Sequence, residues 1–404
     1  MRILFLSQLF DPENAIKGLS FVKALAAAGH DVDVITAFPS YPGGKVYPGF
    51  RQRWRQVEKA APRVRVTRVA TYISQDRSGL KRLLGYASFA AMAFVQALFH
   101  KRPDVVYAYY PPVVGGVAAI TLGACKRAPV VYDVQDLWPE AVVASGMVRE
   151  GWLTLVIEGM AGFIYRRAAA VVTLSDGYRT ALLKKGVASG KVFRIYNWCD
   201  EARISVDDDV RSDNQVFSVV YAGNLGAAQG LDAVVRAAGI VAERGHANVR
   251  FDFIGDGVEK PVLQELVSSM GLENVRFVDK VPPEQIGALL GQAGALVAHL
   301  RDDPVFSITV PQKTQAYLLA GRPLLMAIGG ESADIIRRAN AGVVAEPGSP
   351  AQIAEAAIHL SGLSVIERQE MGKRGRAFYK QHMSQENGVG QTLALLEQVA
   401  RPRA

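Results

Sequence analysis

The sequence predicts an α/β protein made of two doubly wound units, each a parallel sheet covered by helices. Apolar runs of strand length alternate with runs of helix length through both halves of the chain, which is typical of βαβ units. Several predicted strands end in glycine-rich turns, where backbone can approach a ligand closely. A polar stretch without apolar period, residues 203–215, separates the halves and is expected to be a linker. With 404 residues, half of them apolar, the chain is long enough for two well-filled cores.

The first half, residues 1–202, alternates from its start. RILFLSQLF is interpreted as the first buried strand, and FVKALAAAGH as a helix that ends at a glycine. Later strands are expected in DVDVITAF, VRVTRVATYI, DVVYAYYP, PVVYDVQD, AAVVTLS and VFRIYNWCD.

The second half, residues 216–375, restarts the same alternation. Its strands are expected in VFSVVYAGNLG, VRFDFIGDG, VRFVDKV, ALVAHL, PLLMAI and AGVVAEPG, with helical segments between them. Residues 376–404 form a helical tail that we expect to pack back on the first half.

Basic residues are concentrated in one stretch. Residues 41–102 contain 13 Lys and Arg against 2 Asp and Glu, a local charge of +11 in a chain whose net charge is +8. This indicates an anionic partner at one surface. No nucleic-acid recognition motif accompanies the charge, so we expect no nucleic acid and favour an anionic membrane surface.

One segment of this stretch, residues 79–102, is apolar with basic residues at both ends. It is short for a transmembrane helix. Two interpretations remain: a buried helix of the α/β sandwich, or an interfacial helix held by apolar burial and by anionic headgroups. The second would place the protein at the inner face of the cytoplasmic membrane as a peripheral protein.

The cysteines and histidines predict neither a disulfide framework nor a metal site. Only Cys125 and Cys199 occur, without paired spacing, and the six histidines form no HExxH or comparable pair. The first residues, MRILFLSQLF, are too short and strand-like for a signal peptide. We therefore expect a cytoplasmic, reducing environment.

Two turns at predicted strand ends suit an anionic ligand. A predicted strand that ends in Arg301 precedes residues 304–331, which contain a loop, a helix with Lys313 at its entrance, and a second strand. Backbone N–H groups at a helix start suit a phosphate, and a cation there adds to the dipole field. The turn at Gly18 offers a similar close approach. Either turn could also be an ordinary βαβ connection.

A polar cluster follows the predicted strand PVVYDVQD. Asp133, Gln135, Asp136, Trp138 and Glu140 lie at its carboxyl end, where buried polar groups are costly unless they bind something. This pattern indicates a site; alternatively, Asp136 caps the next helix. The Asp207–Asp209 run lies in the linker and is expected to be solvated.

Motifs spread over nearly the whole chain resemble glycosyltransferase family 4, retaining enzymes of the GT-B fold. The resemblance is strongest to the branch that includes N-acetylfucosamine transferases of surface-polysaccharide synthesis. YDVQDLWPE and GNLGAAQGL together are specific for it. Weaker matches are the Gly18 turn, AAAGHDVDVIT, NWCD, FIGDGVEK, VRFVDKV, VPQK, AGRP and GGESADII.

The resemblance implies two Rossmann-like domains facing a central cleft. Residues 1–202 would bind the acceptor, and residues 216–375 would bind a nucleotide sugar linked to UDP. It implies retaining transfer of an N-acetylhexosamine or deoxy-N-acetylhexosamine to a lipid-linked or glycan acceptor in cell-surface polysaccharide or glycoconjugate synthesis, with no cofactor and no metal.

Roles for individual residues follow from the same resemblance. Asp136 and Lys313 are the catalytic candidates. The donor diphosphate is assigned to Gly18, Gly223, Asn224 and Lys313, the base, ribose or sugar to Gly255, Val281 and Glu331, and the acceptor to Tyr41, Asp133 and Trp138.

The chain also departs from the family. The typical pair of glutamates would fall on Ile308 and Ala316, and the Arg and Lys of the Gly-rich loop on Asn224 and Gln229. Lys313 therefore becomes the main cation for the departing diphosphate. Without a carboxylate pair at proper spacing, a covalent glycosidase-type route is not expected. We expect same-face attack, with the leaving phosphate accepting the acceptor proton.

Two alternatives remain open. The protein could be a catalytically impaired member that acts as a scaffold, which the residues at Ile308 and Ala316 would explain. It could also be a GT-B nucleotide-sugar epimerase, which would act without an acceptor.

Overall fold

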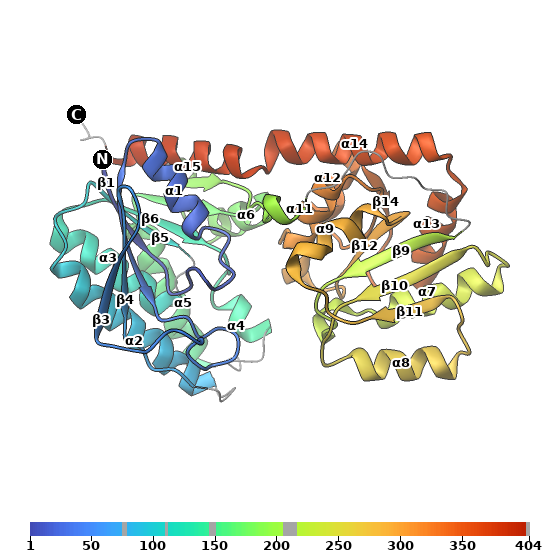
Figure 1. Cartoon of the computed structure of the whole chain (residues 1–404). Helices are drawn as coiled ribbons and strands as arrows, with labels where there is room; N and C mark the ends of the chain where they lie inside the picture. The colour runs from blue at the N-terminus through green and yellow to red at the C-terminus, as the bar shows by residue number, and fades with distance from the viewer. Residues whose placement is uncertain (75–78, 110–111, 145–150, 205–215, 401–404) are drawn as a thin grey trace. The chain divides into compact units, whose positions relative to one another are not determined.

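A computed structural model describes residues 1–74, 79–109, 112–144, 151–204 and 216–400 (Figure 1). The chain forms two compact units. The first comprises Met1–Tyr196 together with Gly388–Ala404, and the second comprises Asn197–Asn387. Most of the expected linker 203–215, including the Asp207–Asp209 run, lies outside the described residues.

The first unit is built on an eight-stranded sheet with the order β3-β4-β2-β1-β5-β6-β7-β8. All pairs are parallel except the hairpin of β3 and β4. The strands are β1 (Arg2–Leu6), β2 (Asp31–Ala37), β3 (Arg55–Ala61), β4 (Val64–Val69), β5 (Val105–Tyr109), β6 (Val130–Val134), β7 (Ala170–Thr173) and β8 (Val192–Arg194). Five of them are central and almost fully buried because helices cover both faces.

Helices of the first unit cover different faces of this sheet. On one face, Tyr107 of β5 lies 6.0 Å from the ring of Phe21 in α1. On the other face, Ala108 lines an apolar pocket with Phe89 of α2 and Ala119 of α3. The helices are α1 (Leu19–Ala27), α2 (Gly79–Leu98), α3 (Val113–Lys126), α4 (Glu140–Ala144), α5 (Trp152–Arg167), α6 (Asp176–Lys184) and the short η1 (Ser189–Lys191).

The second unit has a fully parallel six-stranded sheet with the order β11-β10-β9-β12-β13-β14. The order reverses between β9 and β12, so the carboxyl ends of these two strands flank the point where doubly wound sheets bind ligands. The strands are β9 (Phe217–Ala222), β10 (Val249–Ile254), β11 (Val275–Val278), β12 (Ala295–His299), β13 (Leu324–Ala327) and β14 (Gly342–Val344).

Helices pack on both faces of this second sheet, and its core is a continuous cluster that includes Val219, Val234, Phe251 and Ile353. The elements are η2 (Glu201–Arg203), η3 (Ala227–Gln229), α7 (Asp232–Glu243), α8 (Lys260–Ser269), α9 (Pro283–Gly291), α10 (Pro304–Ser307), α11 (Gln312–Ala320), α12 (Glu331–Ala339), α13 (Pro350–Gly362), α14 (Val365–His382) and α15 (Gln385–Ala400). Helix α15 begins in the second unit and continues into the first.

The predicted architecture of two doubly wound α/β units is confirmed. One strand was missed: β3 has a charged, half-exposed sequence, RQVEKAA, because it is an edge strand with a solvent-facing side. None of the helices in the described part of the chain has the length and hydropathy needed to span a bilayer.

Candidate functional site

Two glycine-rich strand exits meet at the switch point of the second unit. Gly223 follows β9 with φ +138°, and Gly255 follows β10 with φ +141°. A Cβ on Gly255 would lie 2.0 Å from the carbonyl oxygen of Gly223. Only glycine allows this backbone-on-backbone packing, which leaves the peptide groups of both turns close to the ends of the strands.

Lys313 reaches this point from the first turn of α11. Its Nζ lies 3.4 Å from the centre of the Tyr221 ring, and a Cβ on Gly223 would lie 2.7 Å from its Cε. Among the described residues, no carboxylate pairs with it. Burial lowers the pKa of Lys313 to about 7. The side chain therefore lies along the Gly223 turn as a cation without its own counterion, which an anionic ligand could supply.

Two tyrosines hold the strand end that receives Lys313. The Tyr221 hydroxyl donates a hydrogen bond to the carbonyl oxygen of Asn224 at 2.6 Å. The Tyr317 hydroxyl, on the helix that carries Lys313, accepts from the Ala222 N–H at 2.8 Å. The first bond joins the Gly223 turn to β9, and the second joins α11 to β9. Together they fix Lys313 relative to the turn.

Asn224 and Gln229 stand where the family has a cationic pair, and here they brace the loop. Gln229 Oε1 accepts from the Gly226 N–H at 3.1 Å and from Asn224 Nδ2 at 3.4 Å. A cation reaches the same loop from β12: Arg301 Nε donates to the carbonyl oxygen of Ala227 at 2.5 Å. Arg301 follows the predicted strand ALVAHL and was assigned no function from the sequence.

His299 is the last residue of β12, two positions before Arg301, and it connects two loops through hydrogen bonds. Its Nδ1 lies 2.6 Å from the carbonyl oxygen of Gln229, and its Nε2 accepts from the Gly348 N–H at 2.9 Å. Accepting at Nε2 requires the neutral ring with its proton on Nδ1. Burial lowers the pKa of His299, which favours this neutral form.

The start of α12 packs on the loop that precedes Lys313. Gly330 has φ +62°, and a Cβ there would lie 1.9 Å from the carbonyl oxygen of Ser307. No side chain caps the first backbone N–H groups of α12, and Glu331 lies in its first turn, partly buried. Ile308 and Ala316 are partly buried and apolar, so neither supplies a carboxylate here.

Val281, predicted to frame the base or ribose, lies beyond the end of β11 at Val278, in a loop before α9. It is partly buried, and the neighbouring Asp279 is paired with Lys260 at 2.6 Å. Gly255 and Val281 thus follow adjacent strands of the sheet, and their contact with a base stays a prediction.

In the first unit, Asp133 belongs to a buried network. It is fully buried and forms an ion pair with Lys17, which is also fully buried. Lys17 Nζ donates to the Tyr107 hydroxyl at 2.9 Å, and Gln135 Nε2 donates to Asp133 Oδ1 at 2.6 Å. The carboxylate therefore joins the β1–α1 loop to the ends of β5 and β6. This burial favours a structural role over the acceptor contact predicted for Asp133.

Asp136 and Trp138 lie on the exit of β6 and are only partly buried. The Trp138 ring meets the Tyr86 ring of α2 edge-on at 6.4 Å. Burial raises the pKa of Tyr86, and the nearby charge of Asp136 adds to the increase. The structure thus brings a carboxylate and two aromatic rings together at this strand end, a combination that suits a sugar.

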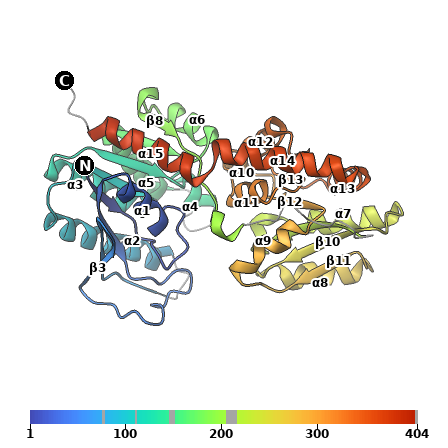
Figure 2. The ribbon, with the colours of Figure 1, turned by 45° about the horizontal axis from the view of Figure 1, so that its top comes forward.

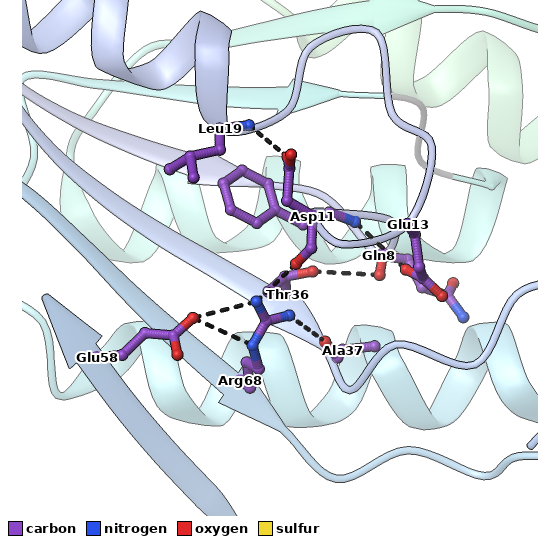
Figure 3. Close-up of polar contacts among 9 residues, drawn as sticks. Gln8, Asp11, Glu13, Leu19, Thr36, Ala37, Glu58 and Arg68 are labelled. Carbon is purple, nitrogen blue, oxygen red and sulfur yellow. Dashed lines mark hydrogen bonds and ion pairs between the residues drawn. The ribbon is translucent and has the colours of Figure 1, made fainter. Parts of the chain in front are cut away.

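The Gly18 turn already holds an anionic group. The Leu19 N–H at the start of α1 donates to Asp11 Oδ2, and a Cβ on Gly18 would lie 2.2 Å from that oxygen (Figure 3). Asp11 itself is held by Arg68, whose Nη2 donates to its carbonyl oxygen at 2.6 Å. The predicted contact of Gly18 with the donor diphosphate stays a prediction, and it would require this carboxylate to move.

Tyr41 is anchored through its backbone. Glu13 Oε1 accepts from the N–H groups of Ser40 and Tyr41, both at 2.7 Å. Glu13 is buried, and desolvation raises its pKa although these bonds oppose the shift. The Tyr41 ring is 60% exposed. Glu13 could not be recognised as an anchor from the sequence, because its hydrogen-bond partners lie in a loop that begins 27 residues later.

Two domain families match the chain. Residues 19–198 match the glycosyl transferase 4-like domain, and residues 216–362 match the glycosyl transferases group 1 domain. The chain belongs to the family 4 type of glycosyltransferases. The two matches together cover most of both units. They show that the chain is an enzyme, a transferase of the GT-B type.

Named relatives agree with the family. The glycosyltransferase is 29% identical over 309 residues to the putative colanic acid biosynthesis glycosyl transferase WcaI of Escherichia coli (strain K12), covering 72% of this chain and 74% of the relative. It is 26% identical over 373 residues to a glycogen synthase of Mycobacterium tuberculosis, covering 88% of this chain and 85% of that protein.

Solved structures show the same fold. A sucrose-phosphate synthase from Thermosynechococcus elongatus superposes with a TM-score of 0.72 at 16% identity over 98% of each chain. Anabaena HepE in complex with UDP and glucose superposes with a TM-score of 0.67 at 17% identity, over 98% of this glycosyltransferase and 99% of HepE. In the described part of the chain, no group of three or more His, Cys, Asp or Glu side chains could hold a metal ion.

Proposed function

We propose that the protein is a retaining glycosyltransferase that moves a sugar from a nucleoside diphosphate sugar, with the donor bound by the second unit. The position of Lys313 carries this proposal. It is a partly buried lysine at the ligand-binding end of a doubly wound sheet, beside a glycine turn, and no carboxylate of the described residues pairs with it. A diphosphate provides the charge that this arrangement lacks.

The surrounding groups suit departure of the diphosphate. When the glycosidic bond breaks, negative charge develops on the leaving phosphate. Lys313 stabilises that charge directly, and the uncapped N–H groups at the starts of α11 and α12 add partial positive charge. Arg301, held over the Ala227 loop, is a second candidate cation in place of the family pair that is Asn224 and Gln229 here. No metal ion is needed in this proposal.

The sugar and nucleotide are inferred from chemistry and from the relatives. HepE is solved with UDP and with UDP-glucose, which supports a UDP-linked donor here. Glu331, in the first turn of α12, is proposed to contact the ribose or the sugar, with Gly255 and Val281 beside the base. The resemblance to the N-acetylfucosamine branch favours an N-acetylhexosamine or a deoxy-N-acetylhexosamine.

The acceptor is assigned to the first unit, at the exit of β6. Trp138 and the exposed ring of Tyr41 offer surfaces on which a sugar ring can pack. Asp136 is the candidate for orienting the acceptor hydroxyl. The relative WcaI is described as a glycosyl transferase of colanic acid biosynthesis, which supports a lipid-linked or glycan acceptor in surface-polysaccharide synthesis. Attack on the same face as the departing phosphate, which takes the hydroxyl proton, gives retention.

A lipid-linked acceptor fits peripheral contact with the cytoplasmic membrane through residues 79–102. Helix α2 exposes Leu80 and Leu84 at 68% and 49% of their surface, between basic residues of the same segment. This contact accounts for the local charge of +11 in residues 41–102 without invoking nucleic acid.

Transfer assays with a panel of UDP-, GDP- and dTDP-sugars and polyprenyl-diphosphate-linked acceptors test the proposal, with and without EDTA. We expect transfer from one donor class, unaffected by EDTA, with the anomeric configuration retained by NMR. Absence of both nucleotide binding and transfer across the panel contradicts the proposal.

A second function is favoured by Ile308 and Ala316, which remove the two carboxylates typical of the family. In that case the protein binds nucleotide sugar as a scaffold and does not turn it over. Tight nucleotide binding by calorimetry, combined with no transfer to any acceptor of the panel, identifies this alternative.

A further inference from the structure

Three helices form one layer on the first sheet. Helix α3 packs against both α2 and α5, so the three lie side by side (Figures 1 and 2). Each turns a buried face to the sheet, through residues such as Phe89 of α2, Ala119 of α3 and Ile164 of α5. The layer therefore also has a continuous outer face, made by the opposite sides of the same helices.

The outer face is apolar on both flanking helices. On α5, Trp152 and Leu155 are 76% and 69% exposed, and Val156 and Phe163 follow at helical spacing on the same side. Helix α2 repeats the pattern. Its exposed apolar side chains are Leu80, Leu83, Leu84, Val95 and Leu98. Large side chains that are exposed at helical spacing on both helices flanking α3 form two apolar stripes rather than scattered apolar residues, and exposed apolar surface of this kind marks an interaction site.

The charges on this layer are almost all positive. The three helices contain a single acidic residue, Glu158, which lies 3.7 Å from Lys185. A basic pair lies at or just after the end of each helix, at residues 101–102, 126–127 and 166–167. Some of these cations also cap carbonyl oxygens: Lys126 Nζ donates to those of Leu98 and His100. Within the described part of the chain, none of the six forms an ion pair with a carboxylate.

We propose that the outer face of the α2–α3–α5 layer lies flat on an anionic membrane, with Trp152 and Leu155 of α5 entering the headgroup region beside α2. Apolar burial and the three basic pairs act together in such a contact. A second copy of the chain would carry the same positive charge, so self-pairing of this face is opposed by repulsion that anionic lipid removes.

This inference rests on the membrane-proximal acceptor of the proposed function and adds residues outside 79–102 to the contact. Helix α2 also contacts the candidate acceptor site from its other side, because the Tyr86 ring meets the Trp138 ring at the exit of β6. A lipid-linked acceptor anchored in the bilayer would then present its sugar close to the sheet end that we assign to it.

The test is sedimentation of the full chain with phosphatidylglycerol-containing vesicles and with pure phosphatidylcholine vesicles, without donor or acceptor. Two double variants are compared with the natural protein: Trp152→Gln with Leu155→Gln on α5, and Leu80→Gln with Leu84→Gln on α2. The matched control is Val262→Gln, which changes a 57% exposed valine on α8 of the second unit.

We expect each double variant to lower the partition into anionic vesicles by roughly tenfold or more, since each removes two apolar side chains that the membrane would bury. The control should change it by less than about twofold, and added salt should weaken binding of the natural protein. As a second readout, tryptophan emission should shift to the blue with anionic vesicles, and Trp152→Phe should remove most of that shift.

The inference is overturned if the α5 variant binds vesicles like the natural protein while the α2 variant does not, because a single interfacial helix then suffices. It is also overturned if the α5 variant loses only self-association in gel filtration. Since neither nucleotide nor acceptor is present, vesicle binding can persist when the proposed transfer fails, and nucleotide binding can persist when vesicle binding fails.

Discussion

Lys313 Nζ lies 3.4 Å from the centre of the Tyr221 ring, and that ring is part of the strand whose exit forms the Gly223 turn. A ring face attracts a cation, but it neutralises no charge. Lys313 is thereby kept close to the backbone of the turn and keeps the capacity to pair with an anion. Two predictions about ligand binding follow from this relationship.

Replacing Lys313 by Met should weaken binding of the nucleoside diphosphate by about 10- to 150-fold, since a charge-assisted hydrogen bond of about 1.5–3 kcal/mol is lost. Calorimetry with UDP measures the change. Lys373→Met, which removes a 67% exposed lysine on α14, is the matched control and should leave the affinity unchanged. Equal affinity in the Lys313 variant would remove this residue from the site.

Donor binding should depend on pH around neutrality. In the empty site the pKa of Lys313 is about 7, and a bound diphosphate raises that pKa because it stabilises the charged form. Above pH 7 binding must therefore take up a proton, and affinity falls as pH rises, by up to about tenfold per unit. Calorimetry in buffers of different ionisation enthalpy measures the uptake, which Lys313→Met should abolish. Proton release on binding would contradict this assignment.

Gly255→Ala should lower the free energy of unfolding by more than the usual cost of placing alanine at positive φ. Its Cβ would lie 2.0 Å from the Gly223 carbonyl oxygen, so the turn must move. Gly245→Ala is the control: it also has positive φ, but no heavy atom lies within 4 Å of the added Cβ. We expect about 1–2 kcal/mol of destabilisation for Gly245→Ala and at least about 2 kcal/mol more for Gly255→Ala. Denaturant unfolding measures both, and equal losses would mean that the close packing is unimportant.

Asp133→Asn should lower the free energy of unfolding by about 3–5 kcal/mol, because it leaves the fully buried Lys17 without its counterion. The double variant Lys17→Met with Asp133→Leu should cost less than the single change, since no charge stays buried. Denaturant unfolding of the two variants gives the comparison. If Asp133 instead binds the acceptor, the single variant will fold normally and show only a raised KM for the acceptor.

Stability should fall in mild acid because of His299. Burial lowers its pKa below the usual 6.5, so the unfolded chain binds more protons than the folded one below that pH. The stabilisation is complete above about pH 6.5 and decreases as pH falls through the window between that value and the lower folded pKa. His299→Gln should flatten this part of the profile, as measured by denaturant midpoints between pH 5 and pH 8. An unchanged slope would assign the acid sensitivity to other groups.

The sequence predicted the two units because their central strands are buried on both faces and therefore appear as uninterrupted apolar runs. The position of Lys313 could also be predicted, since a helix entrance is a local feature. Its burial against Tyr221 could not, because the ring comes from a strand 92 residues earlier in the chain. Periodicity carries no information on which distant side chain fills a given space.

The same limit applies to the contacts of the first unit. Asp133 was correctly placed at the end of a buried strand, but its partner Lys17 comes from a loop whose path depends on the whole sheet. Asp11 could not be connected to the Gly18 turn either, because the acidic side chain precedes the helix by a loop and resembles any solvated carboxylate in sequence. At both positions polar residues join loops to strands, and whether Asp133 or Gly18 also contacts a ligand stays a prediction.

Helix α15 has a consequence for how the protein is made. Its later part belongs to the first unit, where Thr392 is fully buried near the hydroxyl of Tyr107. During synthesis the sheet of this unit leaves the ribosome early, but Gly388–Ala404 emerges only after Asn197–Asn387. The first unit can therefore be completed only after the second unit has been translated, and until then the part of its core near Tyr107 lacks the cover of α15.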